Sequence, residues 1–182
     1  ALPIWIEDLK AAVSDRTRLL ILNSPQNPTG GLLTQSDLTA IAQLAQQHDF
    51  YVLSDEIYSR IIYDQTHNSI LSLPGMKERT ILLDGFSKTY AMTGWRLGYG
   101  IAPRPMAEKL EKLMINSNSC TASFTQMAGV TALQGAQVAY AKIVRWLRRG
   151  SCQKTMSRRC RTAMQRTMIG TTVRVSRRTP ER

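Results

Sequence analysis

The sequence predicts an α/β fold: a three-layer arrangement with a mostly parallel sheet. Apolar runs of strand length, such as "TRLLILN" and "TILLDG", alternate with amphipathic segments of helix length. Runs that are apolar throughout are typical of strands covered on both faces. Strands that alternate with helices pair in parallel, with helices on both faces of one sheet. We therefore expect residues 1–137 to form most of one such domain.

The first elements follow from local patterns. "IEDLKAAVSD" predicts a helix with Ile6, Leu9 and Val13 on one face, and "TRLLILN" predicts a strand. Two prolines and two glycines in "SPQNPTGG" exclude regular structure there. Thr34 has the position of an N-cap with Asp37 in a capping box, so a helix is expected from there to about His48.

The later elements continue the alternation. "FYVLSDE" predicts a strand, followed by a short helical segment from Ile57 and a long loop through "YDQTHNSILSLPGMKER". "TILLDG" and "LGYGIA" predict the third and fourth strands. A proline-led helix is expected in "PRPMAEKLEKLMINSNS", and another in "TASFTQMAGVTALQG", which closes at Gly135.

The net charge of +11 lies entirely in the last part of the chain. Residues 1–144 carry 12 Lys and Arg against 12 Asp and Glu, whereas residues 145–182 carry 12 against one, Glu181. After about Gln137 the apolar periodicity is also lost. We therefore divide the chain into a domain over 1–137 and a basic tail over 138–182.

Several classes of protein are excluded by composition. No apolar run approaches the roughly 20 residues that a membrane helix needs. Cys120, Cys152 and Cys160 are odd in number and lack metal-ligand spacing, and His48 and His67 are the only histidines. These observations predict buried or free thiols in a reducing, cytoplasmic compartment and no metal site. The first residues show no signal-peptide pattern, and the chain reads as an internal piece of a longer protein.

Polar side chains follow the predicted strands. Ligands of parallel α/β sheets bind at the carboxyl ends of the strands. Four side chains of different chemistry are expected at that edge: Asn27, Asp55, Tyr58 and Lys88. Arg96 precedes the fourth strand, so it reaches the same edge only if that strand runs opposite to the others.

Each of these residues also has an ordinary structural interpretation. Asp55 could cap the following helix, Tyr58 could be a half-buried aromatic, and Lys88 and Arg96 could be solvated cations. The "NPTG" segment could be a plain turn. It is the joint arrangement that favours a ligand site. A lysine can form an imine with an aldehyde, an arginine fork can bind a phosphate, and a carboxylate can pair with a protonated ring nitrogen. Pyridoxal 5′-phosphate has all of these groups.

Three segments in order resemble the class I/II aminotransferases: "NSPQNPTGG", "VLSDEIY" and "GFSKTYAMTGWRLGYG". These are fold-type I, pyridoxal-phosphate-dependent enzymes related to aspartate aminotransferase. The resemblance extends from about residue 1 to about 135. It implies that residues 1–137 are an incomplete large domain of such an enzyme. It also implies transfer of an amino group from an L-amino acid to a 2-oxo acid, in a homodimer.

The resemblance implies a role for each residue at the predicted edge. Lys88 would be the Schiff-base lysine and would shuttle the proton, and Asp55 would pair with the pyridinium nitrogen. Tyr58 and Asn27 would bond to the ring oxygen. Arg96 would bind the phosphate with help from Ser87. Many relatives carry a second hydroxyl residue three positions before the lysine, where this chain has Gly85, so one phosphate contact is missing or comes from elsewhere.

Other functions stay open beside this one. C–S lyases and cyclopropane-carboxylate synthases share the fold and these motifs. The family's N-terminal half and its carboxylate-binding arginine have no match in this chain, so we expect the isolated chain to be weakly active or inactive. A different class of function is a non-catalytic fragment whose basic tail binds nucleic acid.

The tail has three interpretations. It can be an out-of-frame continuation of an aminotransferase gene, which the abrupt change in composition favours. It can be a nucleic-acid-binding extension, although it has no fold motif and no interleaved aromatic residues. It can also be a disordered, solvated terminus. Reading all three frames of the encoding DNA after codon 135 would separate the first from the others.

Overall fold

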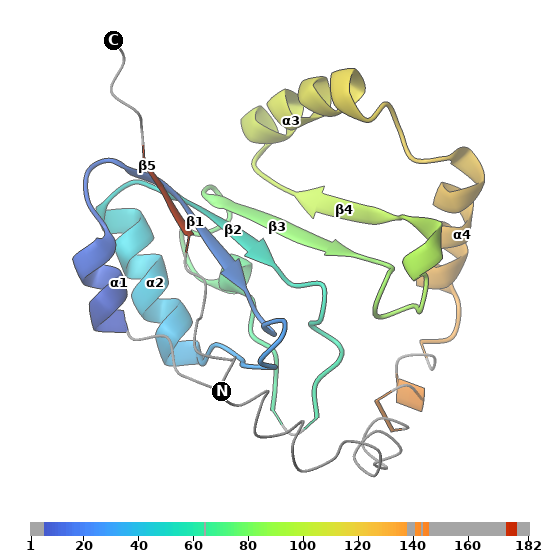
Figure 1. The fold of residues 1–182 in the computed structure, drawn as a ribbon, viewed down its shortest axis with the longest axis horizontal. Helices are drawn as coiled ribbons and strands as arrows, with labels where there is room; N and C mark the ends of the chain where they lie inside the picture. Colours follow the sequence, from blue (N-terminus) through green and yellow to red (C-terminus); the bar gives the residue numbers. More distant parts are fainter. Residues whose placement is uncertain (1–5, 64, 138–140, 143, 146–173, 178–182) are drawn as a thin grey trace.

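The computed structural model describes residues 6–63, 65–137, 141–142, 144–145 and 174–177. Its centre is a five-stranded sheet with the strand order β4-β3-β2-β1-β5 (Figure 1). The strands are β1 (Thr17–Asn23), β2 (Tyr51–Asp55), β3 (Thr80–Gly85), β4 (Gly98–Ile101) and β5 (Arg174–Arg177). The first four lie where the sequence predicts them, because each apolar run is bounded by charged or loop-forming residues.

The pairing directions bring the polar strand ends together. β1 pairs in parallel with β2, where Asn23 is opposite Asp55, and β2 pairs in parallel with β3. β4 runs antiparallel to β3, with Gly85 opposite Gly98. The ends of β1, β2 and β3 and the start of β4 therefore share one edge of the sheet. The predicted α/β class is confirmed, as a mixed sheet with three parallel strands at its centre.

β5 is a strand that the sequence pattern did not predict. Residues Arg174–Arg177 pair antiparallel with β1, with an irregular register between Thr17 and Leu19. Four residues with one apolar side chain among them carry too little periodicity to indicate a strand. The remainder of the predicted 138–182 tail, apart from 141–142 and 144–145, lies outside the described residues.

Two helices pack together on the sheet. α1 (Ile6–Ala12) contacts α2 (Gln35–Gln47), and both contribute to one hydrophobic cluster with β1 and β2. Leu20, Ile41, Phe50 and Val52 have no exposed surface in this cluster. α2 begins as predicted: the Thr34 hydroxyl accepts from the Asp37 N–H, and the Asp37 carboxylate accepts from the Thr34 N–H at 2.9 Å.

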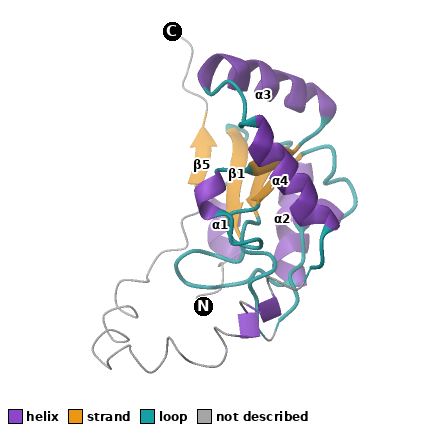
Figure 2. Cartoon of the chain, turned by 90° about the vertical axis from the view of Figure 1, so that its right-hand side faces the viewer, coloured by secondary structure: helices purple, strands orange, loops and turns teal. Residues whose placement is uncertain are grey.

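The other two helices bury much less. α3 (Arg104–Ser117) contributes no buried residue, and α4 (Ser123–Gln134) buries Thr125 and Gly129. Figure 2 shows α3 at the top of the molecule, apart from α1 and α2. Among the described residues, no helix is long and apolar enough to cross a membrane.

The segment after β2 corrects one prediction. Residues 57–60 form hydrogen-bonded turns rather than the short helix expected from Ile57. The Ser59 N–H donates to the Glu56 carbonyl at 2.8 Å, and the Ile61 N–H donates to the Tyr58 carbonyl at 2.8 Å. Both bonds span three residues, so the segment stops before the first full α-helical turn, whose nucleation is unfavourable in so short a stretch. A single-turn 3₁₀ helix, η1 (Ile70–Ser72), follows in the long loop.

Candidate active site

Asn23 joins the ends of β1 and β2 to the "NPTG" loop. Its amide nitrogen donates to the Asp55 carbonyl at 3.2 Å, and its amide oxygen accepts from the Asn27 N–H at 2.9 Å. This one side chain therefore holds the start of the loop against the strand that ends at Asp55. Asn27 itself is exposed at this edge of the sheet.

The Asp55 carboxylate has the capping role considered for it, and this role uses one of its two oxygens. One oxygen, Oδ1, accepts from the Ile57 N–H at 3.2 Å, so Asp55 does cap the turn that follows the strand. Its other oxygen, Oδ2, accepts no hydrogen bond within the described part of the chain. Side chains alternate between the faces of a strand, so Asp55 lies on the face opposite to Ser54 and Glu56. The cap therefore leaves one carboxylate oxygen for a ligand.

Lys88 and Tyr58 are in contact across two loops. The Lys88 ammonium lies 5.5 Å from the centroid of the Tyr58 ring, within the range of a cation–π interaction. Lys88 follows β3 in a tight turn, in which the Ala91 N–H donates to the Lys88 carbonyl at 3.2 Å. The neighbours Phe86 and Thr89 are buried, and Lys88 is half-buried. The turn thus fixes the lysine backbone and leaves its side chain partly open.

Arg96 is connected to the lysine segment through Thr93. The 3₁₀ helix η2 (Thr93–Trp95) ends at Arg96, whose backbone is left-handed with φ of 53°. The Arg96 guanidinium donates to the Thr93 carbonyl at 3.1 Å, and the Thr93 hydroxyl donates to the Ser87 carbonyl at 2.9 Å. No hydrogen bond of the described residues joins the Arg96 and Lys88 side chains directly.

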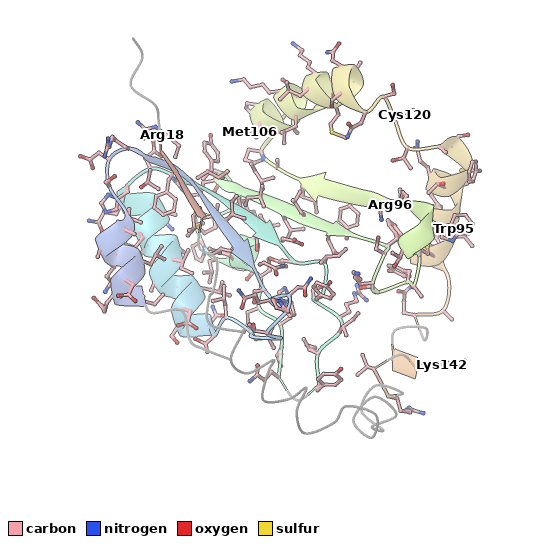
Figure 3. The ribbon with its side chains drawn as sticks, in the orientation of Figure 1. Arg18, Trp95, Arg96, Met106, Cys120 and Lys142 are labelled. Atoms are coloured by element: carbon pink, nitrogen blue, oxygen red, sulfur yellow. The ribbon has the colours of Figure 1, made fainter. Side chains whose placement is uncertain are left out.

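Arg96 lines a hollow beside α3 and α4. This cavity of about 910 Å³ is lined by η2, the start of β4 and the α3–α4 connection, and Trp95 and Cys120 lie on its wall. Figure 3 shows Arg96 beside Trp95, at the end of the sheet where β4 begins. The antiparallel direction of β4 thus meets the condition set by the sequence for Arg96 to reach the edge that carries the other residues.

Gly85 occupies the position where many relatives carry a hydroxyl residue. It is buried between β3 and β4, and a Cβ atom there would lie 2.9 Å from the Gly98 Cα and 3.0 Å from the Leu97 carbonyl oxygen. Such distances are too short for any side chain unless a backbone moves. The close approach of the two strands therefore leaves no room for a side chain at this position.

Asp84 and Tyr99 form a polar pair just before the lysine segment. The Tyr99 hydroxyl donates to the Asp84 carboxylate at 3.1 Å. Burial raises the pKa of Asp84, while hydrogen bonds from Gly85 and Tyr99 act in the opposite direction. Burial and the neighbouring Asp84 raise the pKa of Tyr99 to about 12. Burial thus favours the protonated forms of both groups.

Sequence reasoning missed two residues that organise this edge. Asn23 is the last residue of a predicted strand, and this position at the carboxyl end could have indicated its role. Thr93 had no signal, since an exposed threonine in a loop is common and only the fold shows it bridging Ser87 and Arg96. Asn27, Asp55, Tyr58, Ser87, Lys88 and Arg96 all lie on segments at the predicted edge.

Comparison with known proteins agrees with this arrangement. The family model described as "Aminotransferase class I and II" matches residues 4–176. The chain belongs to the class I and II aminotransferases. An aspartate aminotransferase from Pyrococcus abyssi is 49% identical over 130 residues, covering 71% of this chain and 33% of the relative. The aromatic-amino-acid aminotransferase 2 of Thermococcus litoralis is 48% identical over 130 residues, with the same coverage.

A solved structure extends the likeness to three dimensions. The aromatic aminotransferase from Pyrococcus horikoshii OT3 has a TM-score of 0.74 and 45% identity, covering 82% of this chain and 40% of that one. The chain spans about a third of the length of the curated relatives above. The family match runs past residue 135, where the resemblance of the motifs ends.

The residues present fit the cofactor of this family. Class I aminotransferases of the aspartate aminotransferase type use pyridoxal phosphate. One sheet edge carries five suitable groups: an amine, a phenol, an amide, a guanidinium, and a carboxylate oxygen without a hydrogen bond in the described chain. Each has a counterpart on pyridoxal phosphate. The side chains at this edge are therefore chemically suited to bind pyridoxal phosphate.

Proposed function

We propose that this chain carries the cofactor-binding core of a pyridoxal-phosphate-dependent aminotransferase. The reaction is the transfer of an amino group from an L-amino acid to a 2-oxo acid. The observation that carries the proposal is the Lys88 ammonium 5.5 Å from the Tyr58 ring. Tyr58 lies three residues after Asp55, so an imine-forming amine and a carboxylate stand on neighbouring segments of one edge.

The chain's own residues would divide the work between them. When bound, pyridoxal phosphate supplies an aldehyde and a ring that withdraws electrons from the substrate Cα. Lys88 would hold the aldehyde of the cofactor and, as an amine, would accept the proton from the substrate Cα. Asp55 would keep the ring nitrogen protonated through Oδ2, the oxygen that is not used in the cap. Tyr58 and Asn27 would bond to the ring oxygen.

The phosphate would be bound at the other end of the same edge. Arg96 offers a planar fork of donors that matches phosphate geometry, and Ser87 offers a hydroxyl. The Thr93 bridge from the Arg96 guanidinium to the Ser87 carbonyl supports a joint role, because it couples the position of η2 to that of the lysine segment. Gly85 and Phe86 offer no hydroxyl, so Ser87 is the one hydroxyl residue between β3 and Lys88.

The relatives suggest the first substrates to test. Their names specify aspartate and aromatic amino acids as amino donors. Aspartate and phenylalanine are therefore the first donors to test, with a 2-oxo acid as acceptor.

We further propose a homodimer in the cytoplasm. The exposed apolar side chains of α4 support the dimer, with Phe124 70% and Met127 66% exposed, and the free thiol of Cys120 supports a reducing compartment.

Borohydride reduction after addition of pyridoxal phosphate tests the proposal. We expect one stable adduct, located by peptide mass spectrometry on Lys88. Lys88→Ala should lose it, and the control Lys77→Ala, at an exposed lysine, should keep it. Adducts spread over the surface lysines, or an unchanged adduct in Lys88→Ala, would contradict the assignment.

A further inference from the structure

Glu56 is a buried carboxylate that the proposed reaction does not use. It is 5% exposed and lies directly between Asp55 and the turn that carries Tyr58. A buried carboxylate is strongly destabilising unless its oxygens are well hydrogen-bonded. The position of Glu56 therefore requires partners, and the structure supplies three.

The partners come from two separate segments. From β2, the Ser54 hydroxyl donates to Glu56 Oε1 at 2.9 Å. From the loop before η1, the Ser69 hydroxyl donates to the same oxygen at 2.7 Å, and His67 Nε2 lies 2.7 Å from Oε2. The carboxylate is satisfied only while this loop is docked against the end of β2, so the two segments hold each other.

The loop is itself fixed at the other end of the network. The Ser69 hydroxyl also accepts from the Leu71 N–H at 3.3 Å, which caps η1. Ile70 of η1 has no exposed surface and belongs to the hydrophobic core. The network therefore connects the hydrophobic core, through Ser69 and the adjacent Ile70, to the carboxylate of Glu56.

The backbone of Glu56 transmits this fixation to the site. Its N–H donates to the Leu83 carbonyl of β3 at 2.9 Å, and its carbonyl accepts from the Ser59 N–H at 2.8 Å. Glu56 is thus the joint between the β2–β3 ladder and the turn that presents Tyr58 to Lys88. Because neighbouring side chains of an extended segment point to opposite faces, a fixed Glu56 also fixes the direction of Asp55.

We infer that Glu56 is a positioning residue. From the face of the sheet opposite to Asp55, it holds Asp55 and Tyr58 in register with Lys88. The inference rests on the proposed function. Residues that orient a binding group contribute about ten- to hundredfold to affinity at metal sites. For Glu56→Ala we expect an affinity for pyridoxal phosphate that is roughly tenfold lower, at the lower end of that range.

The test compares cofactor affinity with thermal stability in three variants. Glu56→Ala removes all three acceptor contacts. Glu56→Gln keeps the shape and an oxygen for the serines, and should recover part of the affinity. Ile70→Val is the matched control, because it weakens the core beside the same loop without touching the network. Affinity is measured by titration with pyridoxal phosphate at a temperature where each variant is folded, together with the visible absorption spectrum of the adduct.

The expected pattern separates positioning from stability. Glu56→Ala should lose affinity and change the adduct spectrum, whereas Ile70→Val should lower the melting temperature and change neither. An affinity in Glu56→Ala equal to that of the unsubstituted chain would overturn the inference. If Glu56→Ala does not fold, Glu56→Gln and His67→Ala carry the same test, and wild-type affinity in both would overturn it. Failure of the unsubstituted chain to form an adduct would instead overturn the proposed function, and the inference with it.

Discussion

The two halves of the described molecule bury their apolar side chains to very different extents. Around α1, α2, β1 and β2, large residues such as Leu20, Ile41 and Phe50 have no exposed surface. Around α3 and α4, Leu113 is 66% exposed and Phe124 is 70% exposed. Both sets of helices carry large apolar side chains, so the difference lies in what covers them. The first half has its own core, and the second presents an apolar surface.

This contrast bears on the candidate site, which lies between the halves. Asp55 and Tyr58 follow β2, on the packed side, and the Glu56 network fixes their segment to the core. Arg96 borders the cavity beside α3 and α4, on the open side. The groups proposed for the ring are therefore held by a core, while the group proposed for the phosphate is held by one short chain of hydrogen bonds.

The largest expected effect separates the two halves directly. Phe50→Ala should lower the free energy of unfolding by about 3–5 kcal/mol, because it empties a fully buried site. At a protein concentration low enough to keep the chain monomeric, Phe124→Ala should change it by no more than about 0.5 kcal/mol, as surface substitutions do. Urea titration followed by circular dichroism measures both. A loss of similar size in the two variants would show that the α4 surface is covered in solution.

A second prediction concerns the contact between β3 and β4. Gly85→Ser should destabilise the fold by about 1–3 kcal/mol, because its Cβ would meet the Gly98 backbone at 2.9 Å. Gly94→Ser is the matched control, since a Cβ at Gly94 meets nothing within 4 Å. The same urea titration compares them. Equal stability of the two variants would mean that β4 can move away from β3 freely.

The smallest expected effect depends on pH. Tyr99 has a pKa raised to about 12 from a reference value of 10.0, so the folded chain keeps this proton longer than the unfolded chain. Its contribution to stability is present below pH 10 and is lost as the pH rises from 10 towards 12. Tyr99→Phe should therefore show a shallower loss of stability in this window than the unsubstituted chain. Parallel curves for the two proteins would contradict the raised pKa.

The sequence predicted β4, α3 and α4 of the open half as well as the elements of the packed half. The strands β1 to β3 and the capping box at Thr34 and Asp37 follow from local patterns, because apolar runs and caps act over a few residues. The segment after Glu56 forms turns instead of the expected helix. Its conformation depends on hydrogen bonds between residues three positions apart and on the buried Glu56 network. β5 depends on a partner strand more than 150 positions away, which no local pattern encodes.

The candidate site divides in the same way. The identities of Asp55, Tyr58 and Lys88 could be read from their places after strands and from the family motifs. The bridge from Arg96 through Thr93 to Ser87 could not, because it depends on a left-handed residue and on the turn around Lys88. The Glu56 network brings together residues up to 15 positions apart, from Ser54 to Ser69, and only the docked loop reveals it.

The central claim is that this sheet edge binds pyridoxal phosphate, with Asp55 on the ring nitrogen, and titration of Asp55→Ala tests it most directly. A hydrogen bond to a charged group contributes about 1.5–3 kcal/mol. We therefore expect Asp55→Ala to bind the cofactor roughly ten- to hundredfold more weakly. Under conditions in which the unsubstituted protein is active, the variant should lose nearly all turnover. Asp8→Ala, at an exposed residue of α1, is the control and should bind as the unsubstituted chain does. Near-normal binding and activity in Asp55→Ala would contradict the account.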